Sequence, residues 1–354
     1  MINKHKTLFF FGRPVAPLYA GVMKIREWLY KSGFFERIQF PVPVVSVGNL
    51  MLGGTGKTPT VIHIARLLRN HGYRPAVVSR GYKGSSKAPY TLVSDGTMII
   101  STADTAGDEA VMMAKQLSNI PILVGKKRAI PCRYAVESLE ADCIILDDGF
   151  QHLAVARDID LVLFDSTNLA GNSRVFPGGP LREQVSSLKR TSAFLLTGRT
   201  GANAKRADTF AELLQTRFTE IPVFSATYSE PFITDIKGKR VDARLLKRPF
   251  LFSAIANPER FVTSVSDLGL FVTDSTAFAD HFSYSQKTAA LLEAKAQDAE
   301  ADCLLTTAKD AVKLEGLNFS RAVYVFHLQQ SPGKDFDDYL LTTLKDLEEA
   351  QSKK

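Results

Sequence analysis

A glycine-rich segment that ends in a lysine and a threonine has the residue types needed to bind phosphate groups. It comprises Met51, Leu52, Gly53, Gly54, Thr55, Gly56, Lys57 and Thr58. Small residues let successive backbone N–H groups turn toward phosphate oxygens. The side chain of Lys57 can reach the β- and γ-phosphates of a nucleotide, and the Thr58 hydroxyl can bind Mg²⁺. The segment therefore predicts a site for a nucleoside triphosphate, with these residues as its contacts.

The residues on both sides of this segment favour a phosphate-binding loop over a glycine turn with a purely structural role. An apolar run at 42–47 predicts a strand before the loop, and residues 58–71 have the spacing of an amphipathic helix. The start of that helix would add its positive end to the site. The strict pattern G-x-x-x-x-G-K-[ST] has glycine where this chain has Met51. We expect the Gly53–Gly54 pair to supply the missing flexibility.

Two adjacent carboxylates follow an apolar run at 143–146. Asp147 and Asp148 would stand at the end of a strand, where nucleotide-binding α/β folds place a Mg²⁺-binding aspartate. The alternative is a solvated turn between strand and loop, which explains a pair of carboxylates less well. His152 lies in the loop that follows, and we expect it to have a structural role.

Asp108 follows Gly107 at the start of an expected helix, and its position allows two roles. It is either an N-cap, the commoner role for aspartate there, or a general base that accepts the proton of an attacking hydroxyl. Thr105 is placed to cap the same helix, so the local pattern leaves the question open. His281 is a lone histidine between Asp280 and Phe282, and such histidines are usually structural.

Three arginines lie in loops that follow expected strands. Because the carboxyl ends of parallel strands share one edge of a sheet, Arg80, Arg128 and Arg182 would gather where ligands bind in such folds. Arginine pairs two donors with phosphate oxygens, so these residues are candidate phosphate contacts. The Lys-Asp steps at 309–310 and 345–346 do not fit the guanine-reading pattern N-K-x-D, which favours ATP over GTP.

Strands and helices alternate along most of the chain, as in an α/β fold with a mostly parallel sheet covered on both faces. A second α/β pattern begins near residue 250, after extended segments that indicate a ribbon-like linker. We expect an N-terminal helix at 1–38, a nucleotide-binding core at 39–224, a linker at 225–245 and a smaller α/β lobe at 246–354. The expected core strands are 42–47, 76–79, 122–124, 143–146, 161–164 and 193–196.

The composition of the chain suits a globular protein with an anionic partner. The 354 residues carry a formal net charge of +7, but the lysines and arginines are dispersed, and no nucleic-acid-binding signature is present. Cys132, Cys143 and Cys303 are widely spaced in apolar contexts, which indicates reduced core residues of a cytosolic protein rather than a metal site. The chain has no apolar run of about 18 residues and no secretory signal, so we expect neither a membrane span nor export.

The segment from Pro17 to Phe35 combines apolar residues at helical spacing with aromatic and basic side chains. A helix that lies in a membrane interface needs this mixture, because apolar groups enter the acyl boundary and cations face anionic head groups. A core helix with solvated cations is an equally good interpretation of the pattern.

Taken together, these motifs resemble the tetraacyldisaccharide 4′-kinase family of Gram-negative bacteria. The resemblance covers nearly the whole chain, from Arg26 to the segment at 306–313, with the motifs in the same order. It implies transfer of the γ-phosphoryl group of ATP to the 4′-hydroxyl of a tetraacylated glucosamine disaccharide 1-phosphate, which yields lipid IVA. The implied fold is a P-loop α/β/α sandwich and a smaller α/β lobe joined by a two-stranded linker, with an N-terminal amphipathic helix.

The resemblance also implies roles for individual residues. Asp108 would be the catalytic base, assisted by His281 from the second lobe. Thr58, Asp147 and Asp148 would hold Mg²⁺. The resemblance further places Arg182 and Glu183 at the nucleotide and Arg80, Tyr82 and Arg128 at substrate or phosphate groups. The implied partners are the lipid substrate and the anionic cytoplasmic face of the inner membrane, to which the N-terminal helix would bind, with no nucleic acid and no obligate protein partner.

Two other classes of protein remain possible from the residues alone. An ATP-dependent ligase or synthetase with the same loop would act on a water-soluble acid and would need no interfacial helix. A nucleotide switch would need guanine-reading or metal-ligand motifs, and neither is evident in the sequence.

Overall fold

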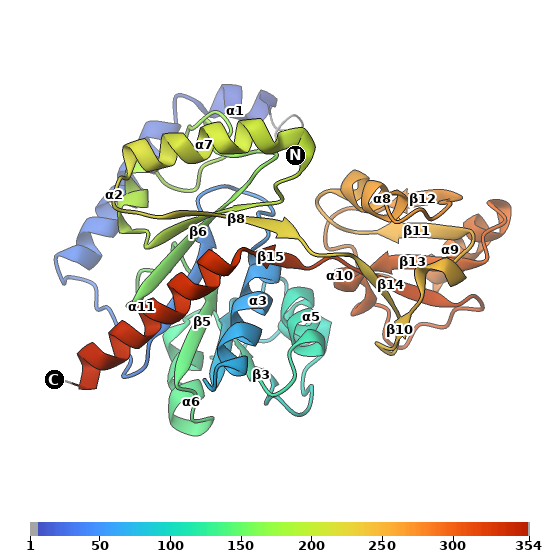
Figure 1. Ribbon diagram of the computed structural model, residues 1–354, viewed down its shortest axis with the longest axis horizontal. Coiled ribbons are helices and arrows are strands. Elements are labelled where there is room, and N and C mark those ends of the chain that lie inside the picture. The colour runs from blue at the N-terminus through green and yellow to red at the C-terminus, as the bar shows by residue number, and fades with distance from the viewer. Residues whose placement is uncertain (1–5, 353–354) are drawn as a thin grey trace.

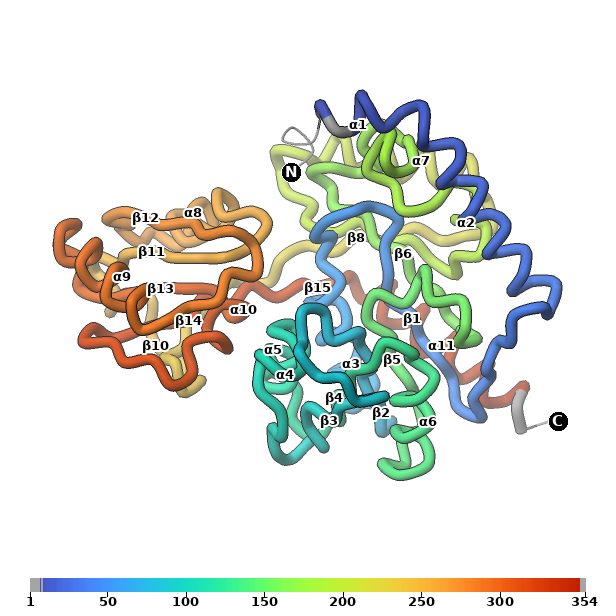
Figure 2. Tube along the Cα trace, turned by 180° about the vertical axis from the view of Figure 1, so that it is seen from behind, coloured from blue at the N-terminus to red at the C-terminus, as the bar shows by residue number. Residues whose placement is uncertain are grey.

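The computed structural model describes residues 6–352, which form two lobes placed side by side (Figures 1 and 2). In the described residues the strands form one nine-stranded and one six-stranded sheet. The larger sheet has the order β15-β8-β7-β6-β1-β5-β2-β4-β3, with antiparallel strands only at its two edges. Its strands are β1 (Val44–Asn49), β2 (Pro75–Ser79), β3 (Thr91–Ser94), β4 (Ile122–Val124), β5 (Cys143–Asp147), β6 (Ile159–Asp165), β7 (Ala193–Thr197), β8 (Val223–Tyr228) and β15 (Gln330–Pro332).

The central strands are apolar runs because helices cover both faces of this sheet. Every residue of β1, β5, β6 and β7 is buried. One face packs against α3 (Lys57–Asn70), α5 (Asp108–Gln116) and α11 (Lys334–Ser352), and the other against α6 (Ala129–Ser138) and α7 (Ala204–Arg217). The α/β fold and the core strands expected from the sequence are confirmed.

The smaller lobe repeats the same architecture at a smaller scale. Its sheet has the order β10-β9-β14-β13-β11-β12, and α8 and α9 bury apolar residues on its two faces. A short helix, α10, follows β13 directly. The elements are β9 (Phe232–Asp235), β10 (Arg240–Val241), β11 (Pro249–Ser253), α8 (Pro258–Ser266), β12 (Asp274–Ala277), α9 (Gln286–Asp298), β13 (Cys303–Thr307), α10 (Ala308–Ala311) and β14 (Val323–His327).

The lobe boundaries expected from the sequence need correction at both the linker and the C-terminus. The segment at 225–245 is not one ribbon, because β8 belongs to the larger sheet while β9 and β10 belong to the smaller one. The two-stranded connection between the lobes is instead made by β8 and β15, which pair antiparallel (Figure 1). The chain then returns to the larger lobe, where Phe336, Leu340 and Leu344 of α11 are completely buried in the core. Residues 330–352 are therefore not part of the smaller lobe.

Two N-terminal helices, α1 (Lys6–Gly12) and α2 (Ala16–Lys31), lie along the outside of the larger lobe (Figure 2). Ala20 is the buried residue of α2, whereas Leu18, Val22, Ile25 and Trp28 are between 57% and 71% exposed. The core-helix interpretation of this segment is therefore wrong for these side chains. Among residues 6–352, no helix combines the length and apolar character that crossing a bilayer requires. All three cysteines are buried free thiols, as expected.

His327, at the end of β14 beside the lobe connection, is expected to make stability depend on pH. Its ring stacks on Phe232, and its Nε2 lies 3.0 Å from Thr234 Oγ1. Burial lowers the pKa of His327 to about 4, and Arg66 and Arg240 act in the same direction. The unfolded chain then binds a proton that the folded chain does not, so stability falls as pH decreases from about 6.5 to about 4.

In the His327→Gln variant, the free energy of unfolding should change less steeply with pH in this window. The difference in slope should be up to about 1.4 kcal/mol per pH unit. Urea unfolding of both proteins at several pH values in this window measures the difference, in which the contributions of carboxylates cancel. Parallel stability curves for the two proteins would contradict the expectation.

Candidate active site

The glycine-rich loop connects β1 to α3 and takes the form of a phosphate-binding loop. Gly53 and Gly56 have φ angles of 111° and 78°, which lie in the left-handed region that glycine adopts without steric cost. The chain thus turns at Gly53, and no glycine is needed at position 51. Met51 is 3% exposed, and its side chain packs in the core with Phe150 and Leu181. The Met51 side chain therefore attaches the start of the loop to the core.

The loop is held on one side by the segment that carries Arg182. Leu52 N donates to Pro180 O at 2.8 Å, and Arg182 N donates to Leu50 O at 2.7 Å. These bonds bring the Arg182 side chain to Asp148, whose two carboxylate oxygens lie 2.9 and 2.8 Å from Arg182 Nη1. Glu183 is 5% exposed and binds Arg190 Nη2 at 2.7 Å. Its carboxylate is therefore already paired within the protein.

Gln330 of β15 braces the other side of the loop, and nothing in the local sequence indicated it. Its Oε1 accepts a hydrogen bond from Thr60 Oγ1 at 2.5 Å. A Cβ at Gly56 would collide with the Gln330 side chain. Thr60 and Gln330 are 270 positions apart in the sequence. Their contact forms only because the chain returns to the larger lobe through β15.

Asp147 and Asp148 at the end of β5 have opposite electrostatic environments. Burial raises the pKa of Asp147 to about 7, and Glu109 and Asp148 add to the effect. Burial would also raise the pKa of Asp148, but Lys57 and Arg182 outweigh it and hold this pKa below its ordinary value. Lys57 Nζ lies 3.5 Å from Asp148 Oδ1. Asp148 is thus held as a paired anion, while Asp147 lacks a cationic partner at this distance.

The environment of Asp147 fits a bound divalent cation. Ser79 Oγ donates to its Oδ2 at 3.0 Å, but its Oδ1 is buried and has no hydrogen-bond partner among residues 6–352. A cation would satisfy this oxygen and lower the free energy of the ionised form. Among the described residues, no group of three or more His, Cys, Asp and Glu side chains could enclose a metal. Mg²⁺ at phosphate sites takes only one or two carboxylates and completes its shell with phosphate and water, so this arrangement suits it.

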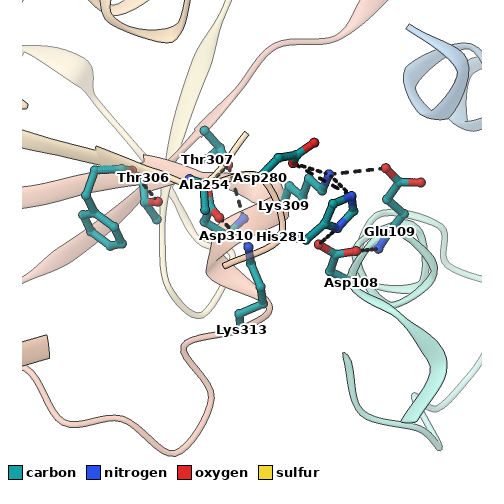
Figure 3. A network of polar contacts seen from close by, with 11 residues as sticks. Asp108, Glu109, Ala254, Asp280, His281, Thr306, Thr307, Lys309, Asp310 and Lys313 are labelled. Atoms are coloured by element: carbon teal, nitrogen blue, oxygen red, sulfur yellow. Dashed lines mark hydrogen bonds and ion pairs between the residues drawn. The ribbon is translucent and has the colours of Figure 1, made fainter. Parts of the chain in front are cut away.

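Asp108 and His281 come from different lobes and meet across the cleft between them (Figure 3). Asp108 Oδ2 lies 2.8 Å from His281 Nδ1, and both side chains are largely buried. Asp108 is the first residue of α5, where its Oδ1 accepts a hydrogen bond from Glu109 N at 3.0 Å, and Gly107 rather than Thr105 is the N-cap residue. His281 has a φ angle of 62°, which is uncommon for a residue with a side chain. The backbone is thus held in an unfavourable conformation at the point where His281 meets Asp108.

Two more residues surround this pair. Lys309 of α10 lies between His281 and the acidic side chains Glu109 and Asp280, as Figure 3 shows. Tyr82 is 57% exposed, and its ring centroid lies 5.3 Å from the ring centroid of His281. A cavity of about 430 Å³ opens beside the pair and is lined by both lobes. A substrate group in this cavity would reach Asp108 directly.

Positive charge gathers near the two aspartates. Arg128 is 4% exposed, and its Nε has no hydrogen-bond partner in the part of the chain that the structure describes. Burial lowers the pKa of His152 to about 4, and Arg128, Arg26, Arg157 and Arg80 act in the same direction. The Nε2 atom of His152 is also buried, and no described residue forms a hydrogen bond with it. An excess of cations with unused donors is the pattern expected where an anion binds.

The chain is similar to known proteins over nearly its whole length. The family model for tetraacyldisaccharide-1-P 4′-kinase (LpxK) matches residues 8–345. The chain is 43% identical to the tetraacyldisaccharide 4′-kinase of Desulfotalea psychrophila over 342 residues, which covers 97% of this chain and 98% of that protein. It is 37% identical to the protein of the same name from Syntrophus aciditrophicus, over 91% and 89% of the two chains. The crystal structure of LpxK from Aquifex aeolicus in complex with ATP is similar, with a TM-score of 0.75, 28% identity and coverage of 94% and 98%.

Proposed function

The chain belongs to the tetraacyldisaccharide-1-P 4′-kinase family, and from this premise we propose the reaction that it catalyses. It transfers the γ-phosphoryl group of ATP to the 4′-hydroxyl of a tetraacylated glucosamine disaccharide 1-phosphate, and the product is lipid IVA. The observation that carries the proposal is the Asp108–His281 pair, which joins the two lobes at a cavity lined by residues of both. A carboxylate in this place suits proton transfer from a sugar hydroxyl.

In this proposal Lys57, Thr58 and the backbone of the glycine-rich loop bind the ATP phosphates. Thr58 and Asp147 would hold Mg²⁺, while Asp148 stays paired with Lys57 and Arg182. When bound, Mg²⁺ supplies positive charge that offsets the charge of the phosphate oxygens. The unpartnered Oδ1 of Asp147 supports this assignment.

Asp108 would accept the proton of the 4′-hydroxyl while the hydroxyl oxygen attacks the γ-phosphorus. His281 holds the Asp108 carboxylate in place through its Nδ1. Since these two residues belong to different lobes, the base is fully positioned only when the cleft is closed, which also excludes water. Arg80 and Arg128 would bind anionic groups of the substrate, and the exposed Tyr82 would contact it beside His281.

A transfer assay tests the reaction. The purified protein is incubated with γ-labelled ATP, Mg²⁺ and tetraacyldisaccharide 1-phosphate in detergent micelles, and the position of the label is determined. Label at the 4′ position is the expected result. Consumption of ATP without labelled lipid would overturn the proposal and favour the synthetase or the switch.

We further propose that the apolar face of α2 binds the cytoplasmic face of the inner membrane. Leu18, Val22, Ile25 and Trp28 project into solvent on a helix that also carries Lys24 and Lys31. The other side of the helix is fixed to the larger lobe, because Arg26 Nη1 donates to Gln151 O at 3.1 Å. Such a helix would place the active site beside its four-chain lipid substrate.

A variant with both Leu18→Ser and Ile25→Ser tests the membrane assignment. Each change removes about 1.5 kcal/mol of apolar transfer free energy, so binding to anionic phospholipid vesicles should weaken roughly 100-fold. Because both side chains are 60% exposed or more, the thermal unfolding temperature should not change. Unchanged vesicle binding, or loss of folding, would contradict the assignment.

A further inference from the structure

Arg260 of α8 is a side chain of the smaller lobe that reaches the larger lobe. Its Nη1 lies 3.4 Å from Asp165 Oδ2 at the end of β6. Its guanidinium carbon lies 4.3 Å from the ring centroid of Tyr228 at the end of β8. A Cβ at Gly198, the residue after β7, would come within 2.8 Å of its Nη2. The guanidinium group thus contacts the ends of three neighbouring strands of the larger sheet.

The two partners of the ion pair are each held in place. Arg260 N donates to Asn257 Oδ1 at 3.2 Å, and the next residue, Phe261, is buried in the core of the smaller lobe. On the other side, Asp165 Oδ1 accepts a hydrogen bond from Thr167 N at 2.8 Å, while its Oδ2 faces Arg260. A planar guanidinium group can pair with a carboxylate and lie against an aromatic ring at once, which an ammonium group does less well.

Strand β7 connects this contact to the nucleotide loop. Its last residue, Thr197, directly precedes Gly198 and is completely buried. Thr197 Oγ1 donates to Thr55 O in the glycine-rich loop at 2.9 Å. A single residue therefore separates the loop from the glycine against which Arg260 packs.

The strand pair that connects the lobes forms a second link to the loop. Tyr228 of β8 stands opposite Gln330 of β15 in the antiparallel pairing. Gln330 Oε1 accepts the hydrogen bond from Thr60 Oγ1, just after the loop in α3. Arg260 therefore packs on the same strand pair that braces the loop, and its contacts position the smaller lobe relative to the loop itself.

Contacts between the lobes lie on both sides of this strand pair. Arg260 contacts the larger lobe on one side, whereas His281 and Lys309 contact Asp108 and Glu109 of α5 on the other. In Figures 1 and 2, α8 lies above the connection formed by β8 and β15, and α5 lies below it. Two strands alone would let one lobe tilt about the connection, so a contact on each side limits this motion.

We infer that Arg260 is a positioning residue for the phosphoryl transfer: through Asp165 and Tyr228 it holds the smaller lobe in the orientation that presents His281 to Asp108. The inference rests on the proposed function, in which Asp108 receives the substrate proton. Arg260 acts only through the orientation of the lobe and touches no reacting atom. The glycine-rich loop keeps its supports without Arg260, because Thr197 and Gln330 hold it directly.

Replacing Arg260 by methionine removes the charge and the planar group but retains an unbranched side chain. In Arg260→Met, kcat should fall about tenfold, because the productive orientation of the lobes becomes less populated. The KM for ATP should stay within about twofold of its value in the unchanged protein, since the loop is intact. Steady-state transfer of labelled phosphate at varied ATP concentrations measures both parameters.

Further variants separate positioning from general support. Arg260→Lys retains the charge and should recover part of the lost kcat. Asp165→Asn should lower kcat in the same direction, and its combination with Arg260→Met should be no slower than Arg260→Met alone, because both changes remove one ion pair. Arg244→Met is the matched control and should leave kcat unchanged, since Arg244 is exposed and its ion pair with Asp242 lies within the smaller lobe.

The orientation of the lobes can be measured without any activity. The three cysteines are buried, so nitroxide labels can be attached through Lys287→Cys on α9 and Lys345→Cys on α11, two exposed positions in different lobes. Pulsed EPR with a non-hydrolysable ATP analogue and Mg²⁺ then gives the distribution of distances between the labels. The distribution should be narrow when Arg260 is present and broader in Arg260→Met.

Each outcome bears on the inference. The same distance distribution in both proteins, or a kcat of Arg260→Met within about twofold of the unchanged protein, would overturn it. A higher KM for ATP with an unchanged distribution would also overturn it, because Arg260 would then contact the nucleotide. If Arg260→Met does not fold, Arg260→Lys carries both measurements. An unchanged protein that transfers no label to the lipid refutes the proposed function instead, and the EPR measurement still tests the role of Arg260.

Discussion

The Asp108→Asn variant is expected to lose about 10³-fold in kcat while it still binds ATP. The amide oxygen can accept the hydrogen bond from His281 Nδ1, which in the unchanged protein spans 2.8 Å. The contact between the lobes therefore survives the change. The amide cannot accept the proton of the 4′-hydroxyl, so the loss is confined to proton transfer.

Single-turnover transfer of labelled phosphate measures this loss, and titration with a fluorescent ATP analogue measures nucleotide binding. Asp346→Asn serves as a control, because Asp346 is exposed on α11, away from the cleft. Turnover of Asp108→Asn within about tenfold of the unchanged protein would contradict the assignment, since general bases contribute at least about 10²-fold.

The Lys57→Met variant is expected to lose about 10²- to 10³-fold in kcat and to show a higher KM for ATP. Methionine has nearly the length of lysine but no charge to place beside the β- and γ-phosphates. Asp148 would lose one of its two cationic partners, so its pKa should return toward the ordinary range. Both effects follow from the removal of one positive charge from a largely buried position.

Steady-state kinetics with varied ATP separates the two parameters. Lys57→Arg should not restore activity, because a planar guanidinium group differs from an ammonium group in size and shape. Normal kcat and normal KM in Lys57→Met would rule out the nucleotide loop as the phosphate site.

The parts of the fold that were predicted correctly depend on neighbouring residues. The core strands are continuous apolar runs because both faces of the larger sheet are covered, and the helix expected at 58–71 is observed as α3, Lys57–Asn70. The loop at 51–58 could be recognised because all the groups expected to bind phosphate are contiguous in the sequence. The position of Asp147 beside Val47, on the strand that leads into this loop, follows from the parallel pairing of β1 with β5, which a mostly parallel sheet makes plausible but does not specify.

The errors arose where long-range contacts decide the structure. The apolar side of α11 gives no information about which lobe it will cover, so the C-terminal segment was assigned to the wrong one. The helical pattern of α2 fits burial and interfacial exposure equally well, and only the contacts of Arg26 and Ala20 show which face is fixed to the protein. Periodicity identifies an apolar face but not the surface that covers it.

The α/β fold class, the glycine-rich loop and the carboxylate pair at the end of β5 could be read from the chain alone, because each is encoded by a short run of residues. The pairing of Asp108 with His281, 173 positions away, depended on the tertiary structure. So did the bracing of Thr60 by Gln330 and the placement of Lys309 beside His281. The physical reason is that these contacts form only when the chain crosses between the lobes and returns through β15, and no local propensity specifies which side chains then meet.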